Sequence, residues 1–186
     1  MQGADSQKKP YTLQTTDNLI FSKDSLNAWG QGCLKQVNNF WCISSTIEYL
    51  CLLYGQPTNE GIIIKAIVYM GYLSYLAMGF EGFVPDVNAI FNNWFSLESR
   101  SSLSTDLISE GYPIVSNVDM GNDITHSVII VGEDSSGNYI CLDPLIGDFT
   151  TYTLSEFKMN YISNGQAHLP VHLRRRGQAH CGRLFA

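Results

Sequence analysis

Four residues of this chain have the types and the order needed for acyl transfer through a thiol. Gln36 lies six residues before Cys42, and His126 and Asp143 follow much later in the chain. In such chemistry a cysteine thiolate is the nucleophile and a histidine is the base. An acidic residue orients the histidine, and an amide donor holds the developing oxyanion. Each residue alone is ordinary, but the four in this order predict a site for thiol-based hydrolysis.

A helix is predicted to begin at Cys42. Apolar side chains recur with helical spacing over residues 42–54, and Gly55-Gln56-Pro57 ends the pattern. At a helix N-terminus, backbone N–H groups and the helix dipole stabilise a thiolate, the reactive form of cysteine. The alternative is a small buried hydrophobe, the usual role of a free cysteine. The position of Gln36 favours the reactive role.

Strand-type runs in the second half of the chain place the histidine and the acid. The predicted strands are residues 113–118, 126–131, 139–143 and 149–153, with a hairpin loop at 133–138. His126 starts the second run and Asp143 ends the third, so a hairpin of these two strands brings them together. Asp143 can then accept a hydrogen bond from the imidazole and fix its tautomer. Asn122 and Asp123 are rival partners on a less rigid loop.

The order of elements predicts an α+β fold with an antiparallel sheet and a cleft where the two halves meet. We expect further helices at about 60–77, 85–94, 102–108 and 155–160, the first capped by Thr58 or Asn59. We divide the chain into an extended arm at 1–30, one folded domain at 31–172 and a basic tail at 173–186. The tail holds Arg174-Arg175-Arg176 and has the character of a vector-derived or frame-shifted end.

The composition narrows the class of partner. Hydrophobic residues make up 45% of the 186 residues and charged residues 15%, which is typical of a globular domain. The net charge of -6 argues against nucleic acid as the main partner. The most apolar stretch, 61–80, is interrupted by Lys65, so no membrane span is expected. No phosphate loop, dinucleotide fingerprint or metal cluster is present in the sequence, so we expect neither cofactor nor metal.

The cysteines and the N-terminus bear on location. The five cysteines show neither a disulfide framework nor zinc spacing, which fits free thiols in a reducing compartment. The first ten residues are polar and lack the apolar stretch of a signal peptide. We therefore expect a protein that stays in the cytoplasm, leaves by a route without such a signal, or has lost its leader.

Over about residues 31–160 the chain resembles the papain-like cysteine peptidases. It is most similar to small bacterial members: the papain-like effector proteases, the staphopains and the double-glycine leader peptidases. The matching motifs are Gln36 to Cys42, Leu107 to Val115, His126 to Gly132, Tyr139 to Pro144 and Thr153 to Phe157. Trp41 and Ile43 flank the cysteine, whereas the double-glycine peptidases usually have an acidic residue and a glycine there.

The resemblance implies a helical lobe that carries Cys42, a β lobe that carries His126 and Asp143, and a cleft between them. It implies that Cys42 is the nucleophile, His126 the base, Asp143 the third member and Gln36 the oxyanion donor. The expected reaction is hydrolysis of peptide bonds in a protein or peptide substrate.

Three alternatives remain open at this stage. The same machinery can release ammonia from a glutamine side chain, as in a deamidase or transglutaminase. The fold can serve as a catalytically silent binding module. The arm at 1–30 can cover the cleft of a latent enzyme.

Overall fold

The structure of the chain is a computed structural model. The residues that it describes are 8–24, 26, 35–38, 41–53, 58–59, 61–63, 96–98, 106–121, 124–157 and 165–168.

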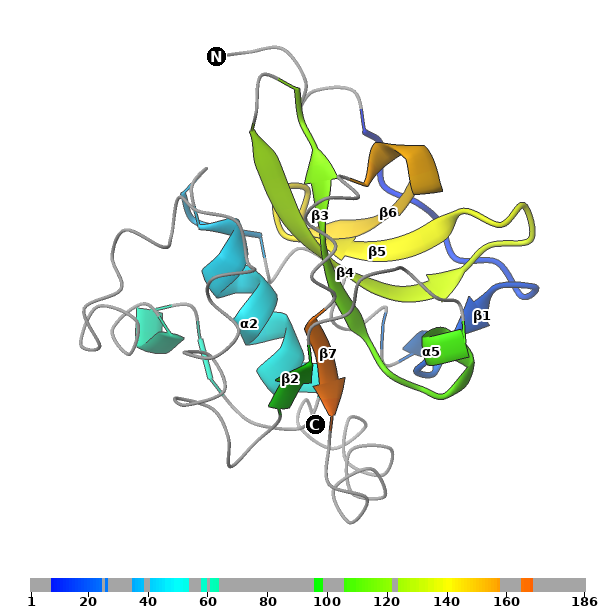
Figure 1. The fold of residues 1–186 in the computed structure, drawn as a ribbon, viewed down its shortest axis with the longest axis horizontal. Coiled ribbons are helices and arrows are strands. Elements are labelled where there is room, and N and C mark those ends of the chain that lie inside the picture. The colour runs from blue at the N-terminus through cyan, green and yellow to red at the C-terminus, as the bar shows by residue number, and fades with distance from the viewer. Residues whose placement is uncertain are drawn as a thin grey trace.

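Within these residues, seven antiparallel strands form one curled sheet (Figure 1). The strands are β1 Asn18–Leu19, β2 Ser96–Glu98, β3 Ile114–Asp119, β4 Thr125–Glu133, β5 Tyr139–Asp143, β6 Asp148–Tyr152 and β7 Gly165–His168. Their order is β2-β7-β3-β4-β5-β6, and β1 also pairs with β4. The helix and the antiparallel sheet fit the predicted α+β class. All four predicted strands are present within one or two residues of their predicted bounds, while β1, β2 and β7 were not predicted.

The β4–β5 hairpin forms where its turn residues predict it. The carboxylate of Asp134 accepts hydrogen bonds from the backbone N–H groups of Ser136 and Asn138, at 2.8 and 2.9 Å. Gly137 follows with φ of 81°, a conformation that glycine adopts without steric cost. This turn fixes the register in which β4 and β5 run side by side.

Helix α2, Cys42–Leu53, packs on one face of the sheet, against β4 (Figure 1). The predicted helix at 42–54 is thus confirmed up to residue 53. Apolar side chains of the helix and of that sheet face form one core cluster, which includes Ile43, Ile47, Leu50, Val115, Ile129, Val131 and Leu142. Burial of this apolar stripe stabilises the helix more than its intrinsic propensity does.

The strand residues that alternate with this set point to the opposite face and form a second cluster. Its members include Ile114, Val118, Val128, Ile130, Tyr139, Cys141, Tyr152 and Phe157. Strands β4 and β5 are therefore buried on both faces, which explains the continuous apolar runs in their central parts. His126 and Asp143 are polar residues at the ends of these buried strands.

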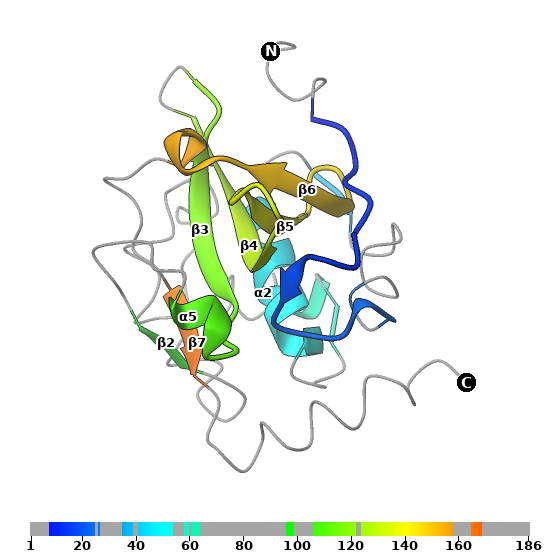
Figure 2. The same ribbon diagram turned by 90° about the vertical axis from the view of Figure 1, so that its right-hand side faces the viewer.

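The described part of the predicted N-terminal arm lies along the sheet (Figure 2). Strand β1 pairs with Gly132 and Glu133, just past the residue of β4 that lies opposite the start of β3, and so extends the pairing along that edge of β4. The backbone N–H of Tyr11 donates to the carbonyl of Phe149 at 2.7 Å. Residues 8–24 thus satisfy backbone groups of β4 and β6. The division of the chain at residues 30 and 172 stays a prediction.

The shorter helices differ from expectation in one place. Helix α5, Asp106–Ser109, overlaps the end of the helix predicted at 102–108, of which residues 102–105 lie outside the described residues. Of the helix predicted at 155–160, residues 158–160 lie outside the described residues. In the described part a single 3-10 turn spans Leu154–Glu156 and does not continue through Phe157, which is extended and bridges to Val118.

Most of the predicted helix at 60–77, and all of the one at 85–94, lie outside the described residues. Residues 61–63 are helical, and Asn59 caps them by accepting from the N–H of Ile62 at 3.1 Å. None of the helices in the described part of the chain has the length and hydropathy that a membrane crossing requires.

Gly132 is required by the close approach of β1. A Cβ at this position would lie 2.4 Å from the carbonyl oxygen of Asn18 and 2.6 Å from Leu19 Cδ2. We expect Gly132→Ala to lower the free energy of unfolding by about 1–3 kcal/mol, because the clash is with backbone that must shift. Urea denaturation measures the difference.

Gly61→Ala is the matched control. Its Cβ meets only the side chain of Asn59, at 3.2 Å, in a helical turn where alanine is favoured. Its stability should be unchanged or raised by up to about 1 kcal/mol. Equal stability of Gly132→Ala and wild type would contradict the described packing of β1.

Candidate active site

Cys42 is the first residue of α2, as the sequence predicts. The helix hydrogen bonds start with the N–H of Ser45, which donates to the carbonyl of Trp41 at 3.0 Å. The thiol is half-buried, and the backbone of Ile43 and of Ser127 lowers its pKa. Ile43 belongs to the helix and Ser127 to β4, so the sulfur lies where the helix N-terminus meets the sheet.

Thr46 ties the first turn of α2 to the strand that carries the histidine. Its hydroxyl donates to the carbonyl of Cys42 at 2.7 Å and lies 3.4 Å from the carbonyl of Ser127. The hydroxyl of Ser127, in β4, donates to the side chain of Asn117, in β3, at 2.7 Å. These buried contacts fix the helix start relative to the residue that follows His126.

His126 lies in β4 with 5% of its surface exposed, and its ring bridges the cysteine and the aspartate. Nε2 is 2.7 Å from Oδ1 of Asp143. The ring and the thiol of Cys42 shift each other's pKa, and Nδ1 is the ring nitrogen that Asp143 does not engage. The contact with Asp143 therefore defines the orientation of the imidazole.

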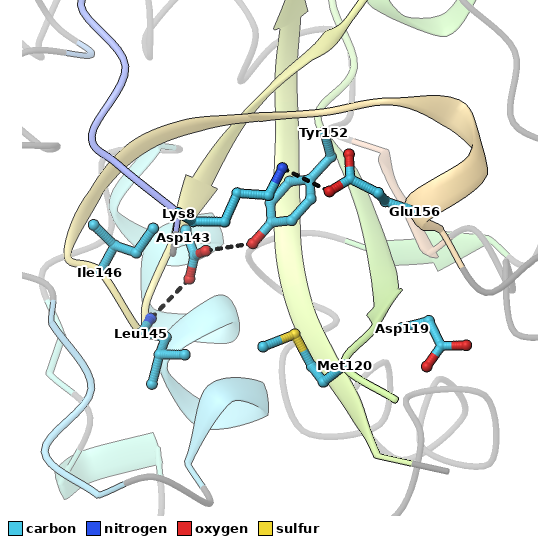
Figure 3. Close-up of a pocket in the computed structure, with 8 residues that line it drawn as sticks. All are labelled: Lys8, Asp119, Met120, Asp143, Leu145, Ile146, Tyr152 and Glu156. Atoms are coloured by element: carbon cyan, nitrogen blue, oxygen red, sulfur yellow. Dashed lines mark hydrogen bonds and ion pairs between the residues drawn. The ribbon is translucent and has the colours of Figure 1, made fainter. Parts of the chain in front are cut away.

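Asp143 ends β5 and is 1% exposed. Its Oδ1 accepts from His126 and from the backbone N–H of Leu145, the latter at 2.9 Å. Its Oδ2 accepts from the hydroxyl of Tyr152 at 2.7 Å (Figure 3). Three hydrogen-bond donors of the protein thus take the place of water around this buried carboxylate. The rival partners, Asn122 and Asp123, lie outside the described residues.

These contacts shift the pKa values of all three groups. Burial raises the pKa of the Cys42 thiol, but the hydrogen bond and positive charge of His126 outweigh it, so the net pKa is lowered. Burial lowers the pKa of His126, but the hydrogen bond and charge of Asp143 raise it overall, with Cys42 adding to this. The pKa of Asp143 is lowered against its burial by His126, Tyr152 and Leu145. All three directions favour a thiolate–imidazolium pair next to a carboxylate.

Gln36 is 7% exposed and is anchored to the turn that follows Asp143. Its backbone N–H donates to the carbonyl of Pro144 at 2.8 Å, and its side-chain Nε2 donates to the carbonyl of Asn38 at 3.0 Å. In the same turn, Gly147 has φ of 72°, and a Cβ there would lie 2.7 Å from the Cβ of Lys35. The segment before the helix and the turn after β5 are therefore packed closely together.

The structure pairs His126 with Asp143 by a hydrogen bond and brings Cys42 near enough for the thiol and the imidazole to shift each other's pKa. It places Gln36 on the loop that leads to the helix, next to the turn of Asp143. Three groups at the site were not predicted from the sequence: the side chain of Tyr152, the N–H of Leu145 and the N–H of Ser127. Two of these are backbone groups, which no residue type marks. Tyr152 lies in a predicted strand, where an aromatic residue indicates core rather than polar contact.

Comparison with known protein families matches residues 30–169 to the Peptidase_C39 like family. The chain belongs to this family. Membership assigns it to the papain-like cysteine peptidase superfamily, as its sequence motifs indicated, and indicates a peptidase of the cysteine type. No curated protein matches the chain. Among the described residues, no group of His, Cys, Asp and Glu side chains could hold a metal ion.

The geometry of this C39-like chain makes Cys42 the most reactive of the three described thiols. Burial raises the pKa of Cys51 to about 12 and that of Cys141 well above its ordinary value, and both are fully buried. At neutral pH, limiting iodoacetamide should therefore label Cys42 before Cys51 and Cys141, as peptide mass spectrometry would show. His126→Ala should slow this labelling roughly 10- to 100-fold, because the thiolate fraction falls when the pKa of Cys42 rises.

His172→Ala is the control, because it removes a histidine that lies outside the four predicted site residues. It should leave the labelling rate of Cys42 unchanged. Labelling of Cys42 that is slow in wild type, or equally fast in His126→Ala, would contradict the coupling of thiol and imidazole.

Proposed function

We propose that this chain hydrolyses peptide bonds with Cys42 as nucleophile, His126 as general base and acid, and Asp143 as the orienting carboxylate. The observation that supports this most is the 2.7 Å contact between Nε2 of His126 and Oδ1 of Asp143, next to a thiol whose pKa His126 lowers. We propose the two-lobe papain-like arrangement with it, in which α2 carries the nucleophile and the sheet carries the base.

The reaction begins with the thiolate of Cys42. Its sulfur attacks the carbonyl carbon of the scissile bond, and the carbonyl oxygen takes up the negative charge. The backbone N–H of Cys42, which has no intrahelical acceptor at the start of α2, is one donor to this oxygen. The side-chain amide of Gln36 is the second, since Nε2 carries two hydrogens and only one is donated to Asn38.

Collapse of the tetrahedral intermediate breaks the C–N bond, and His126 donates its proton to the leaving amine. The acyl group remains on Cys42 as a thioester. Neutral His126 then takes a proton from water as the water attacks the thioester carbonyl. The acid product leaves, and the thiolate–imidazolium pair forms again. Throughout, Asp143 accepts from Nε2 and keeps Nδ1 directed at the sulfur and the leaving group.

Cys42→Ala should lower the hydrolysis of a mixture of synthetic peptides by at least about 10³-fold, because the covalent step is lost. Mass spectrometry reads the new peptide termini. Cys51→Ala is the matched control, since Cys51 is a buried thiol of the same helix that faces the core. It should cost stability but retain catalysis in the folded fraction. Undiminished hydrolysis by Cys42→Ala would contradict the proposal.

The products of this assay separate the proposed reaction from its relatives. New peptide termini support peptide-bond hydrolysis. Ammonia with an intact backbone would instead identify a glutamine deamidase on the same residues. A wild-type chain that releases neither product from any peptide, with an unreactive Cys42, would point to a binding module.

A further inference from the structure

We propose that Tyr152 is a positioning residue of this site, which holds the carboxylate of Asp143 in the orientation that aims Oδ1 at His126. This inference rests on the proposed function and adds a residue to its machinery. Tyr152 touches neither the thiol nor the imidazole in the described contacts, so it acts through Asp143.

The two oxygens of Asp143 have different tasks. Oδ1 lies 2.7 Å from Nε2 of His126 and also accepts from the N–H of Leu145. Oδ2 accepts from the hydroxyl of Tyr152 at 2.7 Å (Figure 3). A carboxylate held at one oxygen can still turn about its Cβ–Cγ bond. A donor on each oxygen fixes the plane of the group, and with it the direction from which His126 is held.

Burial makes the hydroxyl hard to replace. Tyr152 is 4% exposed and Asp143 is 1% exposed. In a position that is almost fully buried, a carboxylate oxygen without a donor loses most of the hydrogen bonds it would have in solution. Loss of the hydroxyl therefore favours the protonated form of Asp143, which holds an imidazolium far less well than the carboxylate does.

Contacts with neighbouring side chains hold the ring of Tyr152 in place, and this fixes the position of its hydroxyl. The ring of Phe157 lies 6.0 Å away at an angle of 60°. Nζ of Lys8 lies 4.2 Å from the ring centroid, and it is held there by Glu156 at 2.7 Å and the carbonyl of Thr151 at 2.8 Å. Figure 3 shows Lys8 and Glu156 beside the ring, on the wall of a pocket of about 130 Å³.

Within the part of the chain that the structure describes, the charged and titratable groups around Asp143 and Tyr152 come from five elements. They are Lys8 of the N-terminal segment, Asp119 of β3, His126 of β4, Cys141 of β5 and Glu156 of the 3-10 turn. Lys8 and Glu156 pair with each other, and burial keeps Cys141 protonated at neutral pH. Asp119 is exposed to solvent at the end of its strand. His126 and Asp143 are therefore the pair that removal of the hydroxyl perturbs.

Tyr152→Phe tests the inference, with Tyr139→Phe as the matched control. Tyr139 lies opposite Tyr152 in the β5–β6 register, packs against the same Phe157 ring and is 7% exposed. The readout is the rate of Cys42 alkylation by iodoacetamide between pH 3 and 9, with circular dichroism to establish folding. A merely structural role would not move the pH dependence of this rate.

Removal of the hydroxyl should move the acid limb of the Tyr152→Phe profile upward by roughly one pH unit. The sign follows from Asp143: the hydroxyl lowers its pKa, so its removal raises the pH at which the carboxylate is protonated and no longer stabilises the thiolate–imidazolium pair. The profile of Tyr139→Phe should coincide with that of wild type. If Tyr152→Phe does not fold, 3-fluorotyrosine at position 152 keeps the shape and strengthens the donor, and the limb should move downward.

The outcomes distinguish this inference from the proposed function. A His126-dependent, selective alkylation of Cys42 whose acid limb is the same in wild type and both tyrosine variants would overturn the role of Tyr152 and leave the proposed function standing. An equal shift in Tyr139→Phe would overturn it too. Unselective alkylation in wild type would remove the proposed function, and this inference with it.

Discussion

The buried contact between the imidazole of His126 and the carboxylate of Asp143 sets the requirement that the rest of the site meets. Two ionisable groups removed from water are stable only when they pair and when their remaining hydrogen-bonding positions are filled. The structure fills them with the thiol of Cys42, the N–H of Leu145 and the hydroxyl of Tyr152. A pair supported in this way is also one in which charge separation between sulfur and imidazole is favoured.

The fold brings these partners together through a short region of chain around the β4–β5 hairpin. His126 and Asp143 lie on adjacent strands, and the turn after Asp143 supplies both the N–H of Leu145 and the carbonyl that anchors Gln36. Helix α2 packs on one face of the sheet, and its apolar stripe and Thr46 attach its first turn to β4. A change that displaces the hairpin therefore affects the base, its orienting acid and the proposed oxyanion donor at once.

The sequence predicted the parts of this site that depend on residue type and chain order. Cys42 at a helix start and Asp143 before a proline carry local signals, and the apolar runs around them define the hairpin. The sequence predicted neither strand β1 nor the contact of Tyr152 with Asp143. A two-residue strand has no periodicity to detect. In a strand pattern Tyr152 indicates a core residue, and only the structure shows the carboxylate beside it. The helix expected at 155–160 does not continue through Phe157 for a related reason, since the long-range pairing of Phe157 overrides the local pattern.

The central claim is that Cys42 is a thiolate paired with a protonated His126 in the resting protein. The ultraviolet absorbance of thiolates, titrated against pH in wild type and in Cys42→Ala, measures this directly, because the difference isolates one sulfur. If the pair is present, the titration midpoint of Cys42 lies well below the ordinary cysteine pKa of about 8.5. This midpoint shifts upward in His126→Ala. A midpoint at or above about 8.5 in wild type, unchanged by loss of the histidine, would contradict the claim.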